Sequence, residues 1–146
     1  MATKKTGKAK NVKSGLIADN IVFESTLELN AYLYLKKQGL KPLYEPRTYT
    51  LVEGFKPSVL YYEGDKKDVK LKLRQIASIK YTPDFEFDYH GIHVVIEMKG
   101  WENDAFPIRF KLFRRFVESQ KQQYIIAKIF TIGQLETFIT LLKNQF

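Results

Sequence analysis

The sequence contains no cysteine, which excludes disulfide bonds and also zinc or iron–sulfur sites with thiolate ligands. It has no run of the roughly 20 apolar residues that a membrane-spanning helix requires. Its basic N-terminus lacks the apolar segment of a secretory signal. These absences are typical of a soluble cytoplasmic protein without a membrane partner.

A length of 146 residues and a hydrophobic content of 45% predict one globular domain, over residues 16–146. The formal net charge is +8, and an N-terminal segment without acidic residues supplies five of these charges. Its lysines are Lys4, Lys5, Lys8, Lys10 and Lys13. We expect residues 1–15 to be a disordered basic tail that contacts nucleic acid phosphates. A tail that only aids solubility is the alternative.

The order of apolar patterns predicts an α/β fold, with a mixed β-sheet flanked by helices. Ser25 and Glu28 have the spacing of a capping box at a helix start, and Pro107 suits the first turn of another helix. Helices are expected over residues 25–37, 107–119 and 131–143, and strands over 47–52, 59–63, 69–81 and 124–130.

The segment from Tyr81 to Gly100 predicts a β-hairpin with a two-residue turn at His90-Gly91. In that register Asp84 lies opposite Glu97, with Cβ atoms roughly 4.5–5.5 Å apart. Lys99 lies on the same face as Glu97 because side chains alternate along a strand. Opposed like charges destabilise a sheet, so this pair indicates a cation between the two carboxylates.

Other interpretations of these residues stay open. The hairpin could present a solvated polar face on which Lys99 neutralises the acids. Glu86 and Asp88 share the face of Asp84 and could join a second metal site, while His93, opposite Asp88, is expected to form a surface pair with it. Glu28 could serve only as the helix cap.

The residue types favour a particular chemistry. Two carboxylates, water and substrate phosphates are the ligands that Mg²⁺ or Mn²⁺ prefers. Such an ion can activate water and neutralise charge at a phosphodiester under attack. Lys99 could orient or deprotonate that water, or stabilise the pentavalent phosphorane.

Pro83-Asp84 followed by Glu97-Met98-Lys99 resembles the motif of the PD-(D/E)xK nuclease superfamily. The segment from Phe23 to Glu28, with Tyr32 after it, is similar to the start of small phage-encoded nucleases of this superfamily, which include Holliday-junction-resolvase-like enzymes. Arg109-Phe110-Lys111-Leu112-Phe113 is also similar to that group.

The resemblance implies a restriction-endonuclease-like core and assigns roles to particular residues. The implied catalytic residues are Glu28, Asp84, Glu97 and Lys99. The implied metal ligands are Asp84, Glu97, Glu28 and the backbone carbonyl of Met98. The expected DNA contacts are Ser25, Arg109, Lys111, Arg114, Arg115 and the tail lysines, together with Trp101, which could stack on a base or pack at the rim of the site.

The expected function is therefore that of a Mg²⁺-dependent DNA endonuclease, with Mn²⁺ as the other metal. By analogy it acts as a homodimer on branched DNA such as Holliday junctions, or it nicks DNA within a recombination machine. The alternative to an enzyme is a non-catalytic basic nucleic-acid-binding module, or a phage structural protein that reuses the fold.

Overall fold

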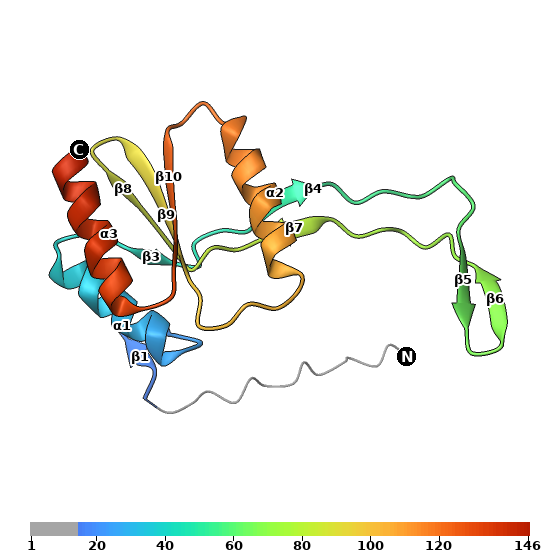
Figure 1. Cartoon of the computed structure of the whole chain (residues 1–146), viewed down its shortest axis with the longest axis horizontal. Coiled ribbons are helices and arrows are strands. Elements are labelled where there is room, and N and C mark those ends of the chain that lie inside the picture. Colours follow the sequence, from blue (N-terminus) through green and yellow to red (C-terminus); the bar gives the residue numbers. More distant parts are fainter. Residues whose placement is uncertain (1–14) are drawn as a thin grey trace.

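A mixed sheet of four strands runs through the centre of the protein (Figure 1). The computed structural model describes residues 15–146. The strands lie in the order β10-β9-β8-β3, with bounds β3 Leu43–Tyr44, β8 Phe85–Tyr89, β9 Ile92–Met98 and β10 Tyr124–Ile129. β8 is antiparallel to both β9 and β3, whereas β10 is parallel to β9. The predicted α/β class with a mixed sheet is confirmed.

The two faces of the sheet pack against different partners. One face carries α1 (Thr26–Lys37) and α3 (Ile132–Gln145), and the other carries α2 (Phe106–Glu118) with the paired strands β4 (Tyr49–Val52) and β7 (Ile79–Tyr81) (Figure 1). Because side chains alternate along a strand, Ile96 enters the first core and Val95 enters the second. The face that carries Glu97 is therefore covered by α2.

The central hairpin has the predicted register. Phe85 pairs with Ile96 and Asp88 with His93, so the expected two-residue turn lies between β8 and β9. His90 and Gly91 have φ values of 47° and 82°, the positive values that a type I′ turn requires. This turn fixes which residues face each other, because a slip of one residue would reverse both faces.

The helix starts also follow the sequence signals. The Ser25 hydroxyl accepts the Glu28 N–H at 3.1 Å, and the Thr131 hydroxyl accepts the Gln134 N–H at 3.2 Å, so each side chain caps its helix. A short hairpin of β1 (Ile17–Ala18) and β2 (Ile21–Val22) precedes α1. Across residues 15–146, no helix combines the length and apolar character that crossing a membrane requires.

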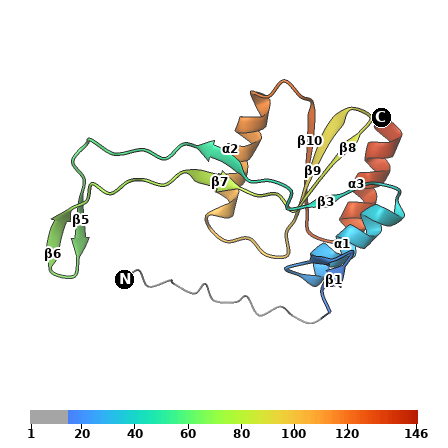
Figure 2. The ribbon, with the colours of Figure 1, turned by 180° about the vertical axis from the view of Figure 1, so that it is seen from behind.

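A long arm leaves the body between β4 and β7 (Figures 1 and 2). An isolated bridge between Phe55 and Ile76 joins its two sides, and β5 (Tyr62–Asp65) pairs with β6 (Asp68–Leu71) at its far end. The prediction of one strand over 69–81 is wrong, because β6 ends at Leu71 and β7 begins at Ile79. The apolar pattern of a sequence does not show where a strand stops pairing with its neighbour.

Candidate functional site

Asp84 and Glu97 lie at the same end of the central hairpin. Asp84 directly precedes β8, and Glu97 is the second-last residue of β9, so the observed register continues to place them opposite each other. The Met98 backbone N–H donates to Asp84 Oδ2 at 2.6 Å, and the Glu45 N–H donates to the Asp84 carbonyl at 2.8 Å. Pro83 is fully buried beside it. These contacts fix the Asp84 carboxylate against β9.

Glu97 is a buried acid with two side-chain partners. The Tyr81 hydroxyl donates to its Oε2 at 2.6 Å, and Lys99 Nζ lies 3.3 Å from its Oε1. Tyr81 is the last residue of β7, so the strand that returns from the arm also holds this carboxylate. No sequence pattern indicated Tyr81, because its role depends on β7 packing across the sheet.

Burial raises the pKa of both carboxyl groups, and the charge of Glu97 adds to the shift at Asp84. Burial, and then the negative charge of Glu97, raise the pKa of Asp84 to about 8. Burial also raises the pKa of Glu97, although the Tyr81 hydrogen bond and the charge of Lys99 act in the opposite direction. Two adjacent carboxylates that resist ionisation together provide an environment in which a cation is favourable.

Lys99 follows β9 and lies at the edge of this pair. Its ammonium is 3.9 Å from the centre of the Phe106 ring, at the start of α2. Its backbone N–H donates to the Ile129 carbonyl of β10 at 2.7 Å. The Lys99 ammonium is therefore held between the face of the Phe106 ring and Glu97, on the predicted face of the sheet.

Glu28 reaches the same region from α1. Its Oε2 accepts the Tyr44 hydroxyl at 2.6 Å and the Glu24 N–H at 3.2 Å, and its Oε1 accepts the Ser25 hydroxyl at 2.7 Å. The charge of Glu28 also raises the pKa of Asp84 and of Glu97, which places it in electrostatic reach of both. Even so, residues 15–146 contain no group of three or more His, Asp or Glu side chains arranged to hold a metal ion.

The basic residues of α2 face solvent. Arg109, Lys111, Arg114 and Arg115 are all exposed, which leaves them free to contact a polyanion. Trp101 is 81% exposed, so most of its ring is open to solvent. The tail lysines lie outside the described residues. Gly15, the last residue of the predicted tail, is described and is an exposed turn residue.

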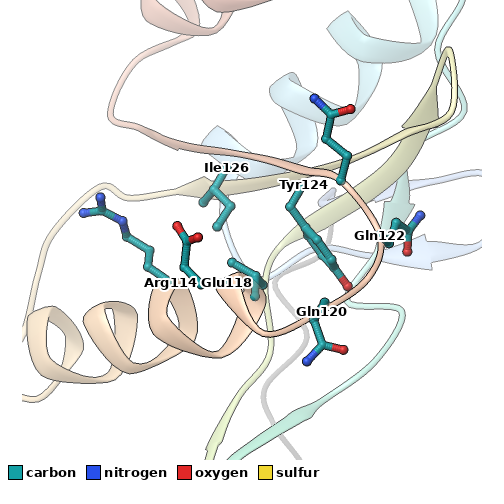
Figure 3. A pocket seen from close by; sticks show the side chains of 8 residues that line it. Arg114, Glu118, Gln120, Gln122, Tyr124 and Ile126 are labelled. Carbon is teal, nitrogen blue, oxygen red and sulfur yellow. The ribbon is translucent and has the colours of Figure 1, made fainter.

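A pocket of about 400 Å³ lies at the end of α2. Figure 3 shows Arg114, Glu118, Gln120, Gln122, Tyr124 and Ile126 around it. Tyr124 pairs with His93 at the beginning of β9, whereas Ile129 pairs with Met98 at its end. The pocket therefore opens near the opposite end of the sheet from Asp84 and Glu97. It is a polar hollow separate from the acidic pair.

A second charged cluster lies on the same face of the sheet. His93 bonds Asp88 at 2.8 Å as expected, but it is only 5% exposed, so the prediction of a surface pair is wrong. Its other ring nitrogen lies 2.7 Å from Glu86, which also accepts Arg47 Nε at 2.8 Å. Arg47 comes from the segment before β4, and this tertiary contact offsets part of the cost of burying Glu86, whose Oε1 has no hydrogen-bond partner within the described residues.

Comparison with known proteins gives a match to one family model. A family model described as a protein of unknown function, DUF1064, matches residues 7–131, which is most of the chain. No curated protein and no solved structure matches the chain. The match covers α1, the arm, and the acidic pair of Asp84 and Glu97. The chain therefore belongs to the DUF1064 family.

Proposed function

We propose that this protein is a metal-dependent endonuclease that hydrolyses phosphodiester bonds in DNA. The observation that carries the proposal is the opposed pair of partly buried Asp84 and buried Glu97, with Lys99 beside it. The proposal includes a restriction-endonuclease-like core, for which the mixed sheet between helices gives support. It also includes a preference for branched DNA, which rests on analogy.

The acidic pair fits a divalent cation by its chemistry. Both carboxyl groups have a raised pKa, so a cation that binds the ionised forms relieves the repulsion between them. Mg²⁺ and Mn²⁺ use one or two carboxylates and take their remaining ligands from water and substrate phosphates. Asp84 and Glu97 would hold the ion, with the Met98 carbonyl as a further oxygen ligand. When bound, the ion supplies an acidified water and charge neutralisation.

The chain's own residues then have separate roles. The Met98 N–H orients Asp84, and the Tyr81 hydroxyl orients Glu97. Lys99 points its ammonium at the edge of the pair, where it stabilises negative charge on a phosphate under attack. Glu28 adds a third negative charge near the site while it remains bonded within the start of α1.

The partners in this proposal are DNA and a second copy of the chain. The exposed basic residues of α2 lie on the helix whose first residue, Phe106, packs against Lys99. They could therefore bind the phosphates that flank the scissile bond. Two cuts in a symmetric junction require two sites, which a homodimer provides.

The second candidate is a nucleic-acid-binding module without catalysis. The Lys99–Glu97 ion pair favours it, because this pair already neutralises one of the two acids. The absence of a three-ligand metal group among residues 15–146 also favours it. The two candidates differ in one measurable property, which is cleavage.

The test is cleavage of supercoiled plasmid and of a synthetic four-way DNA junction with Mg²⁺, Mn²⁺ or EDTA. Wild type is compared with Glu97→Gln, and with Glu136→Gln, which changes an exposed acid on α3. We expect cutting that requires metal and that only Glu97→Gln abolishes. Salt-sensitive binding with no cutting under any metal would instead support the binding module.

A further inference from the structure

A groove of about 360 Å³ lies between α2 and β10, the edge strand of the central sheet. The α2 residues that line it recur at the spacing of one helix face, and the β10 residues alternate along the strand. They are Pro107, Phe110, Lys111 and Arg114 from α2, and Ile126 and Lys128 from β10. Among the described residues, the lining of this α2–β10 groove holds three cations and no carboxylate, which favours an anionic ligand.

Lys128 brings one of these cations to the acidic pair. It pairs with Glu97 in the parallel ladder of β10 and β9, so the two side chains lie on the same face of the sheet. Its ammonium lies 6.0 Å from the centre of the Phe106 ring, and the Lys99 ammonium lies 3.9 Å from the same ring centre. The groove therefore begins beside Lys99 and Glu97. Sequence patterns assign no role to Lys128, because its position depends on the pairing of two strands that are distant in sequence.

A carboxylate of the loop before α2 already contacts this cation. Glu102 Oε1 lies 2.7 Å from Lys128 Nζ, and the two side chains are 29% and 33% exposed. The rings of Phe110 and Phe130, whose centres lie 5.9 and 5.4 Å from the Lys128 ammonium, hold it at the groove. A solvent-accessible ion pair of this kind contributes little to stability, so another anion can replace Glu102 at small cost.

We propose that the α2–β10 groove binds a backbone phosphate of the DNA strand, next to the phosphate under attack, through Lys128, Lys111 and Arg114. Glu102 occupies Lys128 in the free protein and is displaced by that phosphate. The phosphate is the better partner, because the same groove offers it Lys111 and Arg114 as well. This inference rests on the proposed function, since it takes DNA as the substrate, and it adds the path of the bound strand.

The groove also gives the bound strand a direction. Arg114 and Ile126 line both this groove and the polar pocket of Figure 3, so the two hollows are adjacent. β10 runs from Tyr124, at that pocket, to Lys128, beside Glu97. A strand that leaves the acidic pair over Lys128 therefore passes Arg114 and reaches the glutamine side chains of the pocket.

The first test compares Lys128→Ala with Glu102→Gln in the full-length protein, by fluorescence anisotropy of a labelled DNA duplex in EDTA. We expect Lys128→Ala to weaken binding about threefold or more and Glu102→Gln to strengthen it about twofold or more. The signs differ because the first change removes a phosphate contact and the second removes its competitor. If the ion pair only ties the loop to β10, both variants lose the same contact. A change in the same direction in both, or no change in either, would overturn the groove.

Matched variants separate this effect from general effects of charge and folding. Lys41→Ala removes an exposed cation before β3, and Asp104→Asn removes an exposed acid from the same loop as Glu102. Neither should change duplex affinity as much as its counterpart. Lys128→Arg keeps the charge and should restore wild-type affinity, and thermal unfolding verifies that each variant is folded. Inorganic phosphate that binds wild type but not Lys128→Ala in calorimetry, with duplex affinity unchanged, would overturn the assignment to a DNA strand.

The second test locates the contact on the strand. A substrate that wild type cuts is prepared with one uncharged methylphosphonate linkage at successive positions. The linkage next to the scissile bond should raise KM for wild type but not for Lys128→Ala, which has already lost that contact, and kcat should change little. Equal sensitivity of both proteins at every linkage would overturn the groove and leave the nuclease intact. Binding that Lys128→Ala weakens, without cleavage under any metal, would support the groove and overturn the proposed hydrolysis.

Discussion

The Tyr81 hydroxyl donates a 2.6 Å hydrogen bond to Oε2 of Glu97. Tyr81 lies at the end of β7, which belongs to the two-stranded pair under α2, whereas Glu97 lies in the central sheet. The bond thus connects two separately paired strands at the acidic pair. It also counteracts part of the rise in the pKa of Glu97 that burial causes.

Removal of this bond should affect both stability and the ionisation of Glu97. We expect Tyr81→Phe to lower the free energy of unfolding by about 1–3 kcal/mol, because a buried acceptor loses its donor. The pKa of Glu97 should rise, so a nuclease that needs ionised Glu97 should reach full activity at a higher pH. Urea unfolding and a pH–rate profile measure the two effects. Tyr49→Phe, which changes the residue paired with Tyr81, should leave the pH profile in place.

Substitution of Lys99 should distinguish an effect on catalysis from an effect on DNA binding. Lys99→Ala should reduce cleavage at least about 100-fold, the range seen when a charge-stabilising group is removed. Binding of a four-way junction, measured by gel shift, should change less than about threefold, since one phosphate contact contributes little to the total. Lys143→Ala on α3, distant in sequence and bonded to Gln38, is the control. An equal loss of binding and cleavage would contradict a catalytic role.

Stability without metal should depend on pH through Asp84. Its pKa is about 8 in the folded protein and near 3.8 ordinarily, so between these values the folded state holds a proton that the unfolded chain has released. The free energy of unfolding should therefore fall as pH rises from about 4 to about 8, by at most on the order of 1 kcal/mol per pH unit. Urea unfolding in EDTA measures this slope, and Asp84→Asn should reduce it. A slope that is the same in both proteins would refute the assignment to Asp84.

Glu28 can be tested apart from its capping role. Glu28→Gln keeps the size of the side chain and removes its charge, so we expect Mn²⁺ affinity, measured by calorimetry, to fall about 10-fold or more. Ser25→Ala removes the cap, which should cost about 1 kcal/mol of stability without a comparable loss of Mn²⁺ affinity. If Glu28→Gln binds Mn²⁺ as wild type does, Glu28 serves only the helix start.

The basic face of α2 should control the salt dependence of DNA binding. Lys111→Ala removes one exposed positive charge, so the slope of log affinity against log salt should become shallower by about one. Glu118→Gln on the same helix removes no positive charge and should keep the wild-type slope or steepen it slightly. Fluorescence anisotropy of a labelled duplex at several salt concentrations measures this quantity.

Local signals predicted the features that depend on neighbouring residues. The Ser25 and Thr131 caps, the His90-Gly91 turn and the hairpin register follow from short segments, because backbone hydrogen bonds and φ preferences act over a few residues. The opposition of Asp84 and Glu97 followed from that register.

The sequence by itself therefore determined the helices, the central hairpin and the placement of Lys99 on the face of Glu97, all within short stretches of chain. Only the tertiary structure decided which distant groups complete the site. Tyr81 on Glu97, Tyr44 on Glu28 and Arg47 on Glu86 come from segments that pack across the sheet. The tertiary structure also decided that the arm is exposed. Whether a predicted strand pairs with another strand depends on distant contacts that no local pattern encodes.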